Sequence, residues 1–342
     1  MNFVILSWTI LKMLYHLLWC SISLFSFVFN VFWFVCNVAS AGIPWFTLML
    51  LIVCVASKFV KLRSPSAKRL LNFFETGDVA TVDNLAYWPI ANRAASYDAP
   101  GNSKAAIKKC ITRGYRNVML DAGLTACGEI VIVNRSTLER AGLTGAISQH
   151  ALEELRRVNI TSVHPLSSKF DAEYVYTLSE LMEFLENNRL IIFLRISDHS
   201  SHMIEKLKAF IKKNAQFLNQ IILISSSPYA IYQLRKTETD LVCGLWTEKF
   251  LALPILKAST LATSIYGAIY RNIIAPVVGV SVVFVNKDEF NLHIAELWRN
   301  VGVRPIVYNI NSPNEKRYFQ KTMKTQYLTD SLRSEPHLLM KA

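Results

Sequence analysis

The segment from Met13 to Ser57 contains no Asp, Glu, Lys or Arg. Leu, Ile, Val, Phe and Trp predominate in it, and its roughly 45 uncharged residues exceed the about 20 that are needed to cross a bilayer. A cleaved signal peptide has an apolar core of only about 7 to 15 residues, so the length of this segment argues against one. We therefore expect residues 1–58 to form a transmembrane anchor and the protein to be an integral membrane protein of an endomembrane or the plasma membrane.

The anchor could cross the membrane once or twice. Only the patch from Ala39 to Pro44 weakens a helix, because it combines small residues with Gly and Pro. A break there would divide the segment into Leu14 to Asn37 and Trp45 to Lys58. The second piece is short for a span, and both one helix and two helices fit the sequence.

Acidic residues are also absent between the anchor and Glu75, whereas basic residues follow one another there. We interpret residues 59–85 as a basic juxtamembrane linker, which by the positive-inside rule begins on the cytosolic side. Two triplets, Asn134-Arg135-Ser136 and Asn159-Ile160-Thr161, match the acceptor pattern for N-glycosylation and would require a lumenal domain. The sequence therefore leaves the side of the membrane open.

The chain lacks cysteine pairs at metal or redox spacing, although it has 6 cysteines. The net charge of +12 is spread over the linker, the expected helices and a basic stretch from Lys316 to Lys324, without a nucleic-acid motif or interleaved aromatics. These absences exclude a zinc module, a disulfide framework and a nucleic-acid partner. The positive charge favours an anionic lipid surface as a partner.

Short apolar segments rich in β-branched residues recur after the linker and alternate with helical patterns. The segments expected to be strands are Ala86 to Ala91, Asn117 to Asp121, Glu129 to Val133, Leu190 to Ile196, Ile221 to Ser225, Leu241 to Leu245, Ser281 to Val285 and Arg304 to Ile310. Eight strands alternating with helices predict an α/β fold, the TIM (β/α)8 barrel, over residues 86–331, followed by a tail at 332–342. Residues 250–275 are long and apolar for a crossover, which fits either a bulky barrel helix or an insertion that contacts the membrane.

Three of these segments end in polar residues, Asn92, Asp121 and Asn134, which should share one rim of the barrel. The first is followed by Asn92-Arg93-Ala94 and by Asp98-Ala99-Pro100-Gly101-Asn102, and the second is Met119-Leu120-Asp121. This framework resembles the glycerophosphodiester phosphodiesterase family, in particular its membrane-anchored animal branch. The family pattern there is His-Arg-Gly, then Asp-Ala-Pro with Glu-Asn-Thr, then Glu-x-Asp, then His-Asp. The resemblance implies the barrel and a phosphoric diester hydrolase site in phospholipid metabolism.

The residues of that site are largely replaced in this chain. The resemblance places the two proton-transferring histidines at Asn92 and Asn134, and asparagine has no titratable proton near neutral pH. It places four metal-binding carboxylates at Gly101, Met119, Asp121 and Arg195, so that Asp121 is the only ligand retained. No cofactor is therefore expected, unless calcium or magnesium binds an altered form of the family site.

Other family positions are retained. The resemblance implies catalytic and substrate contacts for Arg93, and substrate contacts for Asn102 and Tyr308. Asp98 and Asn102 also fit a purely local role in a turn and a helix cap. Because a buried cation needs a counter-charge, we expect Arg195 to form an ion pair with Asp121 where the family holds its metal.

Two functions fit these substitutions. The first is a catalytically inactive or impaired, membrane-anchored relative that binds a phosphodiester, a lipid headgroup or a protein partner. The alternative is an active metal-dependent enzyme that hydrolyses glycerophosphodiesters or lysophospholipids with rearranged ligands. The barrel alone does not decide between them, because one fold hosts many functions.

Overall fold

The computed structural model describes residues 2–74, 88–186, 188, 190–214, 217–247 and 260–333, which form two compact units, Met1–Val60 and Lys61–Ala342. The end of the expected linker with the start of the first expected strand (75–87), the start of the apolar insertion (250–259) and the tail from 334 lie outside the described part. The helices are α1 (Asn2–Val60), α2 (Ala67–Phe74), α3 (Lys104–Thr112), α4 (Arg135–Arg140), α5 (Leu152–Leu155), α6 (Leu178–Glu186), α7 (Ser201–Lys213), α8 (Phe217–Gln220), α9 (Pro228–Thr237), α11 (Thr260–Ile269), α12 (Ala275–Val278), α13 (Leu292–Asn300) and α14 (Pro313–Arg317). The strands are β1 (Ile90–Asn92), β2 (Asn117–Leu124), β3 (Ile130–Ile132), β4 (Tyr176–Thr177), β5 (Ile191–Ile196), β6 (Ile221–Ser225), β7 (Cys243–Trp246), β8 (Val282–Asn286), β9 (Arg304–Tyr308) and β10 (Gln326–Thr329).

The first unit is the single helix α1, which continues through the Ala39 to Pro44 patch. Its segment Ser7–Val60, 54 residues long, is long and apolar enough to cross a membrane. At 1.5 Å per residue that segment measures roughly 80 Å, against about 30 Å for the hydrocarbon core of a bilayer. Large apolar side chains such as Phe25 and Trp45 are exposed along it.

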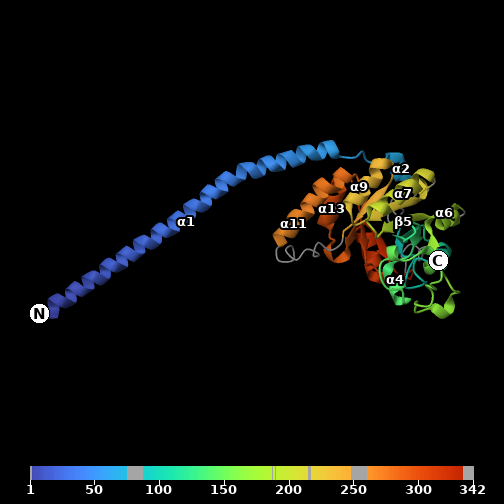
Figure 1. Cartoon of the computed structure of the whole chain (residues 1–342), viewed down its shortest axis with the longest axis horizontal. Coiled ribbons are helices and arrows are strands. Elements are labelled where there is room, and N and C mark those ends of the chain that lie inside the picture. The colour runs from blue at the N-terminus through green and yellow to red at the C-terminus, as the bar shows by residue number, and fades with distance from the viewer. Residues whose placement is uncertain are drawn as a thin grey trace. The chain divides into compact units, whose positions relative to one another are not determined.

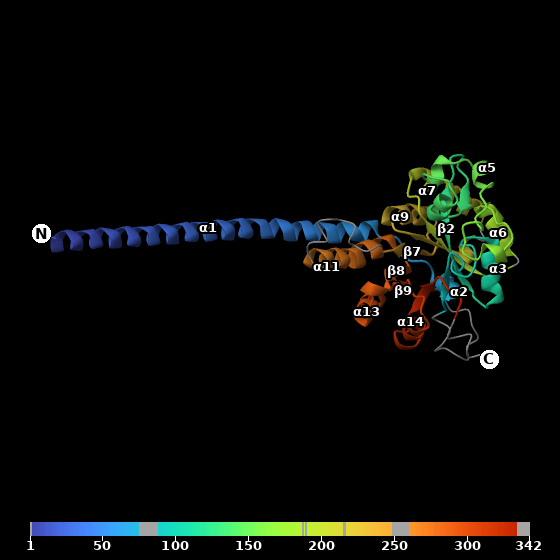
Figure 2. The same cartoon turned by 90° about the horizontal axis from the view of Figure 1, so that it is seen from below.

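The second unit is a closed parallel barrel, as the alternating pattern predicts. Its strands run in the order β1-β2-β5-β6-β7-β8-β9-β10, and β10 pairs in turn with β1. Figures 1 and 2 show the helices that connect these strands on the outside of the barrel. The fold class expected from the sequence is thus confirmed.

The prediction that residues 129–133 form a barrel strand is wrong. Residues 130–132 do form a strand, but β3 pairs antiparallel with β2 and lies outside the barrel, together with β4. The connection from β2 is too short for a crossover helix, and a short connection permits only a hairpin. The eighth place in the barrel belongs to β10, which the sequence analysis did not identify.

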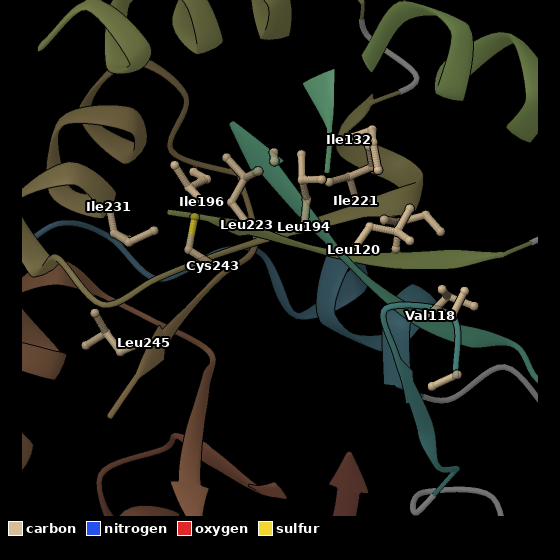
Figure 3. Close-up of a cluster of buried hydrophobic side chains, with 14 of the residues drawn as sticks. Val118, Leu120, Ile132, Leu194, Ile196, Ile221, Leu223, Ile231, Cys243 and Leu245 are labelled. Atoms are coloured by element: carbon tan, nitrogen blue, oxygen red, sulfur yellow. The ribbon is translucent and has the colours of Figure 1, made fainter. Parts of the chain in front are cut away.

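Side chains of the strands alternate between two cores. Val118, Leu120, Leu194 and Leu223 point outward and pack with helix residues such as Ile231 (Figure 3). The residues between them, including Met119, Phe193 and Ile222, fill the barrel interior. Phe73 of α2 joins this inner cluster with strand-start residues, so α2 covers the amino-terminal end of the barrel. The opposite end is left for polar inward-facing residues.

Candidate functional site

Asp121 lies at the centre of a polar cluster at the carboxyl ends of the barrel strands. Its side chain is fully buried, and its Oδ1 accepts a hydrogen bond from Arg195 Nε at 2.7 Å. Its Oδ2 accepts from Arg93 Nε at 2.9 Å and from Asn102 Nδ2 at 3.3 Å. The expected ion pair between Asp121 and Arg195 is therefore confirmed, and Arg93 forms a second one.

The register of the strands brings Asp121 and Arg195 together. The two residues are direct partners in the pairing of β2 with β5, and each lies two residues after an inward-facing core residue, Met119 or Phe193. With a side-chain period of two, both must point into the barrel. The guanidinium of Arg195 also lies over the ring of Trp246, 4.9 Å from its centroid, and this contact fixes its plane.

Trp246, Tyr308 and Phe284 pack together as an aromatic column. The Trp246 ring stacks on Tyr308 at 4.5 Å and on Phe284 at 5.2 Å between centroids. The hydroxyl of Tyr308 donates to the carbonyl of Thr247 at 3.1 Å. Tyr308 thus supports the Trp246 ring that packs against Arg195. Direct contact between Tyr308 and a substrate stays a prediction.

Arg93 reaches Asp121 from a left-handed turn that follows β1. Arg93, Ala94 and Ala95 have φ values of 51°, 57° and 64°, and Asn102 at the far end of the loop has 62°. Each non-glycine residue in this region costs about 1–2 kcal/mol. Burial of Ala94 and Ala95 and a hydrogen bond from Asn102 N to Arg93 O at 2.9 Å hold the turn in place. Strain maintained in this way is typical of functional sites.

Asn102 has a different role from the cap considered above. Ser103 is the N-cap of α3, whereas Asn102 Oδ1 accepts from the backbone N of Asp121 at 3.0 Å. Asp98 also turns away from its own loop, because its carboxylate accepts from Leu332 N at 2.7 Å and from Arg333 Nε at 3.2 Å. Asn102 therefore belongs to the Asp121 cluster, and Asp98 attaches the end of the described chain to the barrel.

Asn92 lies beside a second carboxylate, Asp330, just after β10. Its Nδ2 donates to Asp330 Oδ1 at 2.8 Å, and Ser96 and Asn311 donate to the same carboxylate. The Oδ1 atom of Asn92 is buried and accepts no hydrogen bond from the described residues.

Asn134 follows β3 and caps α4, accepting from Thr137 N at 2.9 Å. The backbone N of Val133 donates to Asp121 O at 3.0 Å, so Asn134 lies next to the cluster on the same rim. Its Nδ2 atom is buried and has no partner in the described part of the chain. A glycan on this buried nitrogen would have no room in the folded domain. The triplet Asn134-Arg135-Ser136 is therefore better explained by the role of Asn134 as a helix cap than by glycosylation.

The residues around Asp121 do not fit a divalent cation. Both carboxylate oxygens already accept hydrogen bonds from guanidinium groups, and two fixed positive charges adjoin the place where an ion would bind. Calcium and magnesium require several oxygen ligands. Of the expected metal positions, Met119 lies in the inner apolar cluster and Gly101 lines a neighbouring cavity. Among residues 2–333 that the structure describes, no three His, Cys, Asp or Glu side chains come together as a metal site.

The cluster is instead suited to an anion. Arg93 and Arg195 each use only Nε for Asp121, and within the described chain no hydrogen bond engages their terminal nitrogens. The side chains are 29% and 22% exposed, so these nitrogens can be reached. Two guanidinium groups and one carboxylate carry a net charge of +1, and the planar Arg fork matches a phosphate.

Most residues of the cluster could thus be predicted from the sequence, and the structure adds others that the sequence did not indicate. Asn92, Arg93, Asn102, Asp121 and Arg195 meet at one end of the barrel, whereas Trp246 and the contact of Asp330 with Asn92 were not foreseen. Period-two counting from Val242 through Gly244 could have placed Trp246, the last residue of β7, inward. No local signal indicates its contact with Arg195.

Comparisons with known proteins agree with this architecture. Residues 93–333 match the model of the glycerophosphoryl diester phosphodiesterase family. Glycerophosphodiester phosphodiesterase 1 of Bos taurus is 29% identical over 265 residues, covering 71% of this chain and 77% of the relative. The protein of the same name from Mus musculus is 26% identical and covers 85% of this chain and 95% of the relative.

Solved structures share the fold. A glycerophosphodiester phosphodiesterase of Agrobacterium tumefaciens has a TM-score of 0.56 at 17% identity, covering 75% of this chain and 100% of its own. A phosphodiesterase of Oleispira antarctica, solved in complex with the product sn-glycerol-3-phosphate, has a TM-score of 0.59 at 16% identity and covers 74% of this chain and 96% of its own.

Proposed function

The chain belongs to the glycerophosphoryl diester phosphodiesterase family, and from this premise we propose that it is a membrane-anchored member that binds a phosphodiester without hydrolysing it. One observation carries the proposal: the single retained carboxylate, Asp121, is held between Arg93 and Arg195. A site that provided a metal to the phosphate now provides guanidinium groups to it.

Binding follows from the charges and the free donors. A phosphodiester carries one negative charge, and the cluster carries one net positive charge in a largely buried setting, where charge-assisted hydrogen bonds are strongest. Both arginines bind Asp121 through Nε, and within the described chain no hydrogen bond engages their terminal nitrogens. The Oleispira antarctica relative holds sn-glycerol-3-phosphate, which supports a glycerophosphate half in the ligand of this chain as well.

Loss of hydrolysis follows from the proton carriers. Cleavage of the ester requires a base to activate water and an acid to protonate the leaving alcohol. Asn92 and Asn134 stand where the resemblance implies histidines, and neither side chain exchanges a proton near neutral pH. Their hydrogen bonds to Asp330 and to α4 give them structural roles instead.

Membrane anchoring is the second part of the proposal. The helix α1 supplies an apolar segment of sufficient length, and the basic residues after Val60 suit an anionic lipid surface. The ligand of the site is then a glycerophosphodiester or the headgroup of a lysophospholipid, both of which present the same phosphodiester.

The test is calorimetry of the full chain in detergent micelles with glycerophosphoinositol and excess chelator. We expect saturable binding that chelator does not change. Replacing Arg195→Ala should weaken it by about 10- to 100-fold, because a charge-assisted hydrogen bond contributes about 1.5–3 kcal/mol. The matched control is Arg156→Ala, which removes the same charge from a residue that pairs with Glu180 away from the site and should leave the affinity unchanged.

An assay of released sn-glycerol 3-phosphate tests the absence of hydrolysis. We expect no release above the protein-free control, with or without calcium or magnesium. Release that chelator abolishes would show an active enzyme with rearranged ligands and overturn the proposal.

A further inference from the structure

A cavity of about 500 Å³ opens beside the Asp121 cluster, between the left-handed turn after β1, the helix α4 and the loop 160–165. Its walls include Arg93 and Ser96 from the turn, Ser136 and Arg140 from α4, and His164 from the loop. None of these elements contributes a residue to the aromatic column of Trp246, Tyr308 and Phe284. The cavity is therefore a separate compartment of the same barrel end.

Arg93 connects the cavity to the phosphate position. Its Nε is bound to Asp121, while the side chain also lines the cavity. A diester whose phosphate contacts Arg93 and Arg195 thus has the cavity immediately next to it. One of the two ester substituents can enter there.

The charges of the cavity are one-sided. Two arginines line it, and no Asp or Glu is among its lining residues in the described chain. Arg140 donates only to neutral acceptors, from Nε to Ser136 O at 3.2 Å and from Nη2 to Thr137 Oγ1 at 3.4 Å. Arg135, on the same helix, differs in this respect because it pairs with Glu139 at 2.6 Å.

His164 completes the wall without adding a free donor. Its Nε2 lies 3.0 Å from Ser96 O and its Nδ1 accepts from Leu166 N at 3.1 Å. Both ring nitrogens are engaged, so the ring fixes the loop against the turn. The cation of the cavity that pairs with no carboxylate among the described residues is therefore Arg140, because Arg93 pairs with Asp121.

We infer that this cavity is a subsite for a second anionic group, a phosphomonoester or a carboxylate, carried by the alcohol substituent of the bound phosphodiester. The inference rests on the proposed function and deepens it, because it makes the ligand a glycerophosphodiester with an acidic headgroup. Arg140 is exposed at the cavity and pairs with no carboxylate in the described chain, so an anionic group can approach its guanidinium and bind it. A headgroup that ends in a quaternary ammonium meets the same arginines as a repulsive contact.

The test compares two diesters that differ by one phosphate, glycerophosphoinositol and glycerophosphoinositol 4-phosphate. Dissociation constants are measured by calorimetry for the full chain in neutral detergent, at one ionic strength and with chelator present. We expect the phosphorylated diester to bind at least about tenfold more tightly, as one charge-assisted contact provides. Arg140→Gln should reduce the ratio of the two constants to near one while changing the affinity for the unphosphorylated diester less than about twofold.

Two further variants keep the result interpretable. Arg135→Gln removes the same charge from the same helix and should leave the ratio at its original value. Arg140→Lys keeps the charge but loses the planar fork, so an intermediate ratio is expected. A ratio near one in the unaltered chain, or an undiminished ratio in Arg140→Gln, overturns the inference alone. Failure of both diesters to bind overturns the proposed function and the subsite with it.

Discussion

At the scale of single residues, Arg195 determines what the end of the barrel can bind. It occupies an inward position next to Asp121, where the resemblance implies a carboxylate, and it brings a positive charge in place of a negative one. Removing one partner of such a pair leaves the other charge partly buried and uncompensated. The substitution at position 195 therefore changes the ligand class of the site rather than its affinity alone.

We predict that a binding site for a divalent cation can be rebuilt at this end of the barrel. Arg195→Asp together with Met119→Glu places three carboxylates at the ends of β2 and β5, and calcium prefers such oxygen ligands. We expect the double variant to bind calcium in calorimetry, whereas the unaltered chain does not. Release of glycerol phosphate should return only when Asn92→His and Asn134→His are added, because both proton carriers are then present.

A matched control for the rebuilt site is Arg156→Asp with Met119→Glu, which makes the same change in net charge but leaves Arg195 paired with Asp121. Hydrolysis by the double variant before the histidines are added would contradict the roles given to residues 92 and 134.

The cysteines of the barrel differ in reactivity for reasons that the structure makes plain. Burial raises the pKa of the thiols of Cys110 and Cys243 from 9.0 to about 12. The hydroxyl of Thr125, at 3.1 Å, lowers the pKa of exposed Cys127. Iodoacetamide at pH 8 should therefore label Cys127 in the folded protein, and the two buried thiols only after unfolding, as peptide mass spectrometry can show.

The same pKa shifts predict a pH dependence. Because the folded-state pKa of each buried thiol is raised, its proton is held more firmly in the folded chain than in the unfolded one. The corresponding stability is fully present below about pH 9 and is lost as the pH rises from there toward 12. The urea midpoint should fall over this range, and Cys110→Ala with Cys243→Ala should flatten the fall.

At the scale of elements, Arg235 joins three pieces of the amino-terminal end of the barrel. It is fully buried at the end of α9 and donates to the carbonyls of Val278 at 2.8 Å and Leu241 at 3.2 Å. Its Nη2 also donates to Arg63 O at 2.7 Å, which attaches the chain after α1 to the barrel. Burial lowers the pKa of the guanidinium, and the surrounding carbonyls compensate for lost hydration.

We expect Arg235→Leu to lower the free energy of unfolding by about 3 kcal/mol or more, because several buried carbonyls lose their donor at once. Urea unfolding followed by tryptophan fluorescence measures the change. Lys236→Leu, at the exposed neighbouring position of the same helix, should cost less than about 0.5 kcal/mol. Equal effects of the two substitutions would contradict the linking role of Arg235.

At the scale of the whole molecule, the chain consists of a long apolar helix and a barrel. The segment Ser7–Val60 exposes large apolar side chains throughout, whereas the barrel buries its own in two cores. An exposed apolar surface of that extent favours a lipid environment. We predict that the full chain stays in the membrane pellet during extraction with alkaline carbonate, as immunoblotting of the two fractions can show. Recovery of the full chain in the supernatant would contradict membrane anchoring.

The sequence by itself determined the barrel and the inward direction of Asn92, Asp121 and Arg195, because strand periodicity is local and the spacing of the family motifs is written in the chain. It did not determine which segment closes the barrel, since the segment of β3 reads as an apolar strand whereas β10 begins and ends with polar residues. The second ion pair of Arg93, the contact of Asn92 with Asp330 and the stacking of Arg195 on Trp246 join residues far apart in the chain. Such contacts depend on the register of neighbouring strands and on the left-handed turn after β1, and only closure of the barrel fixes both.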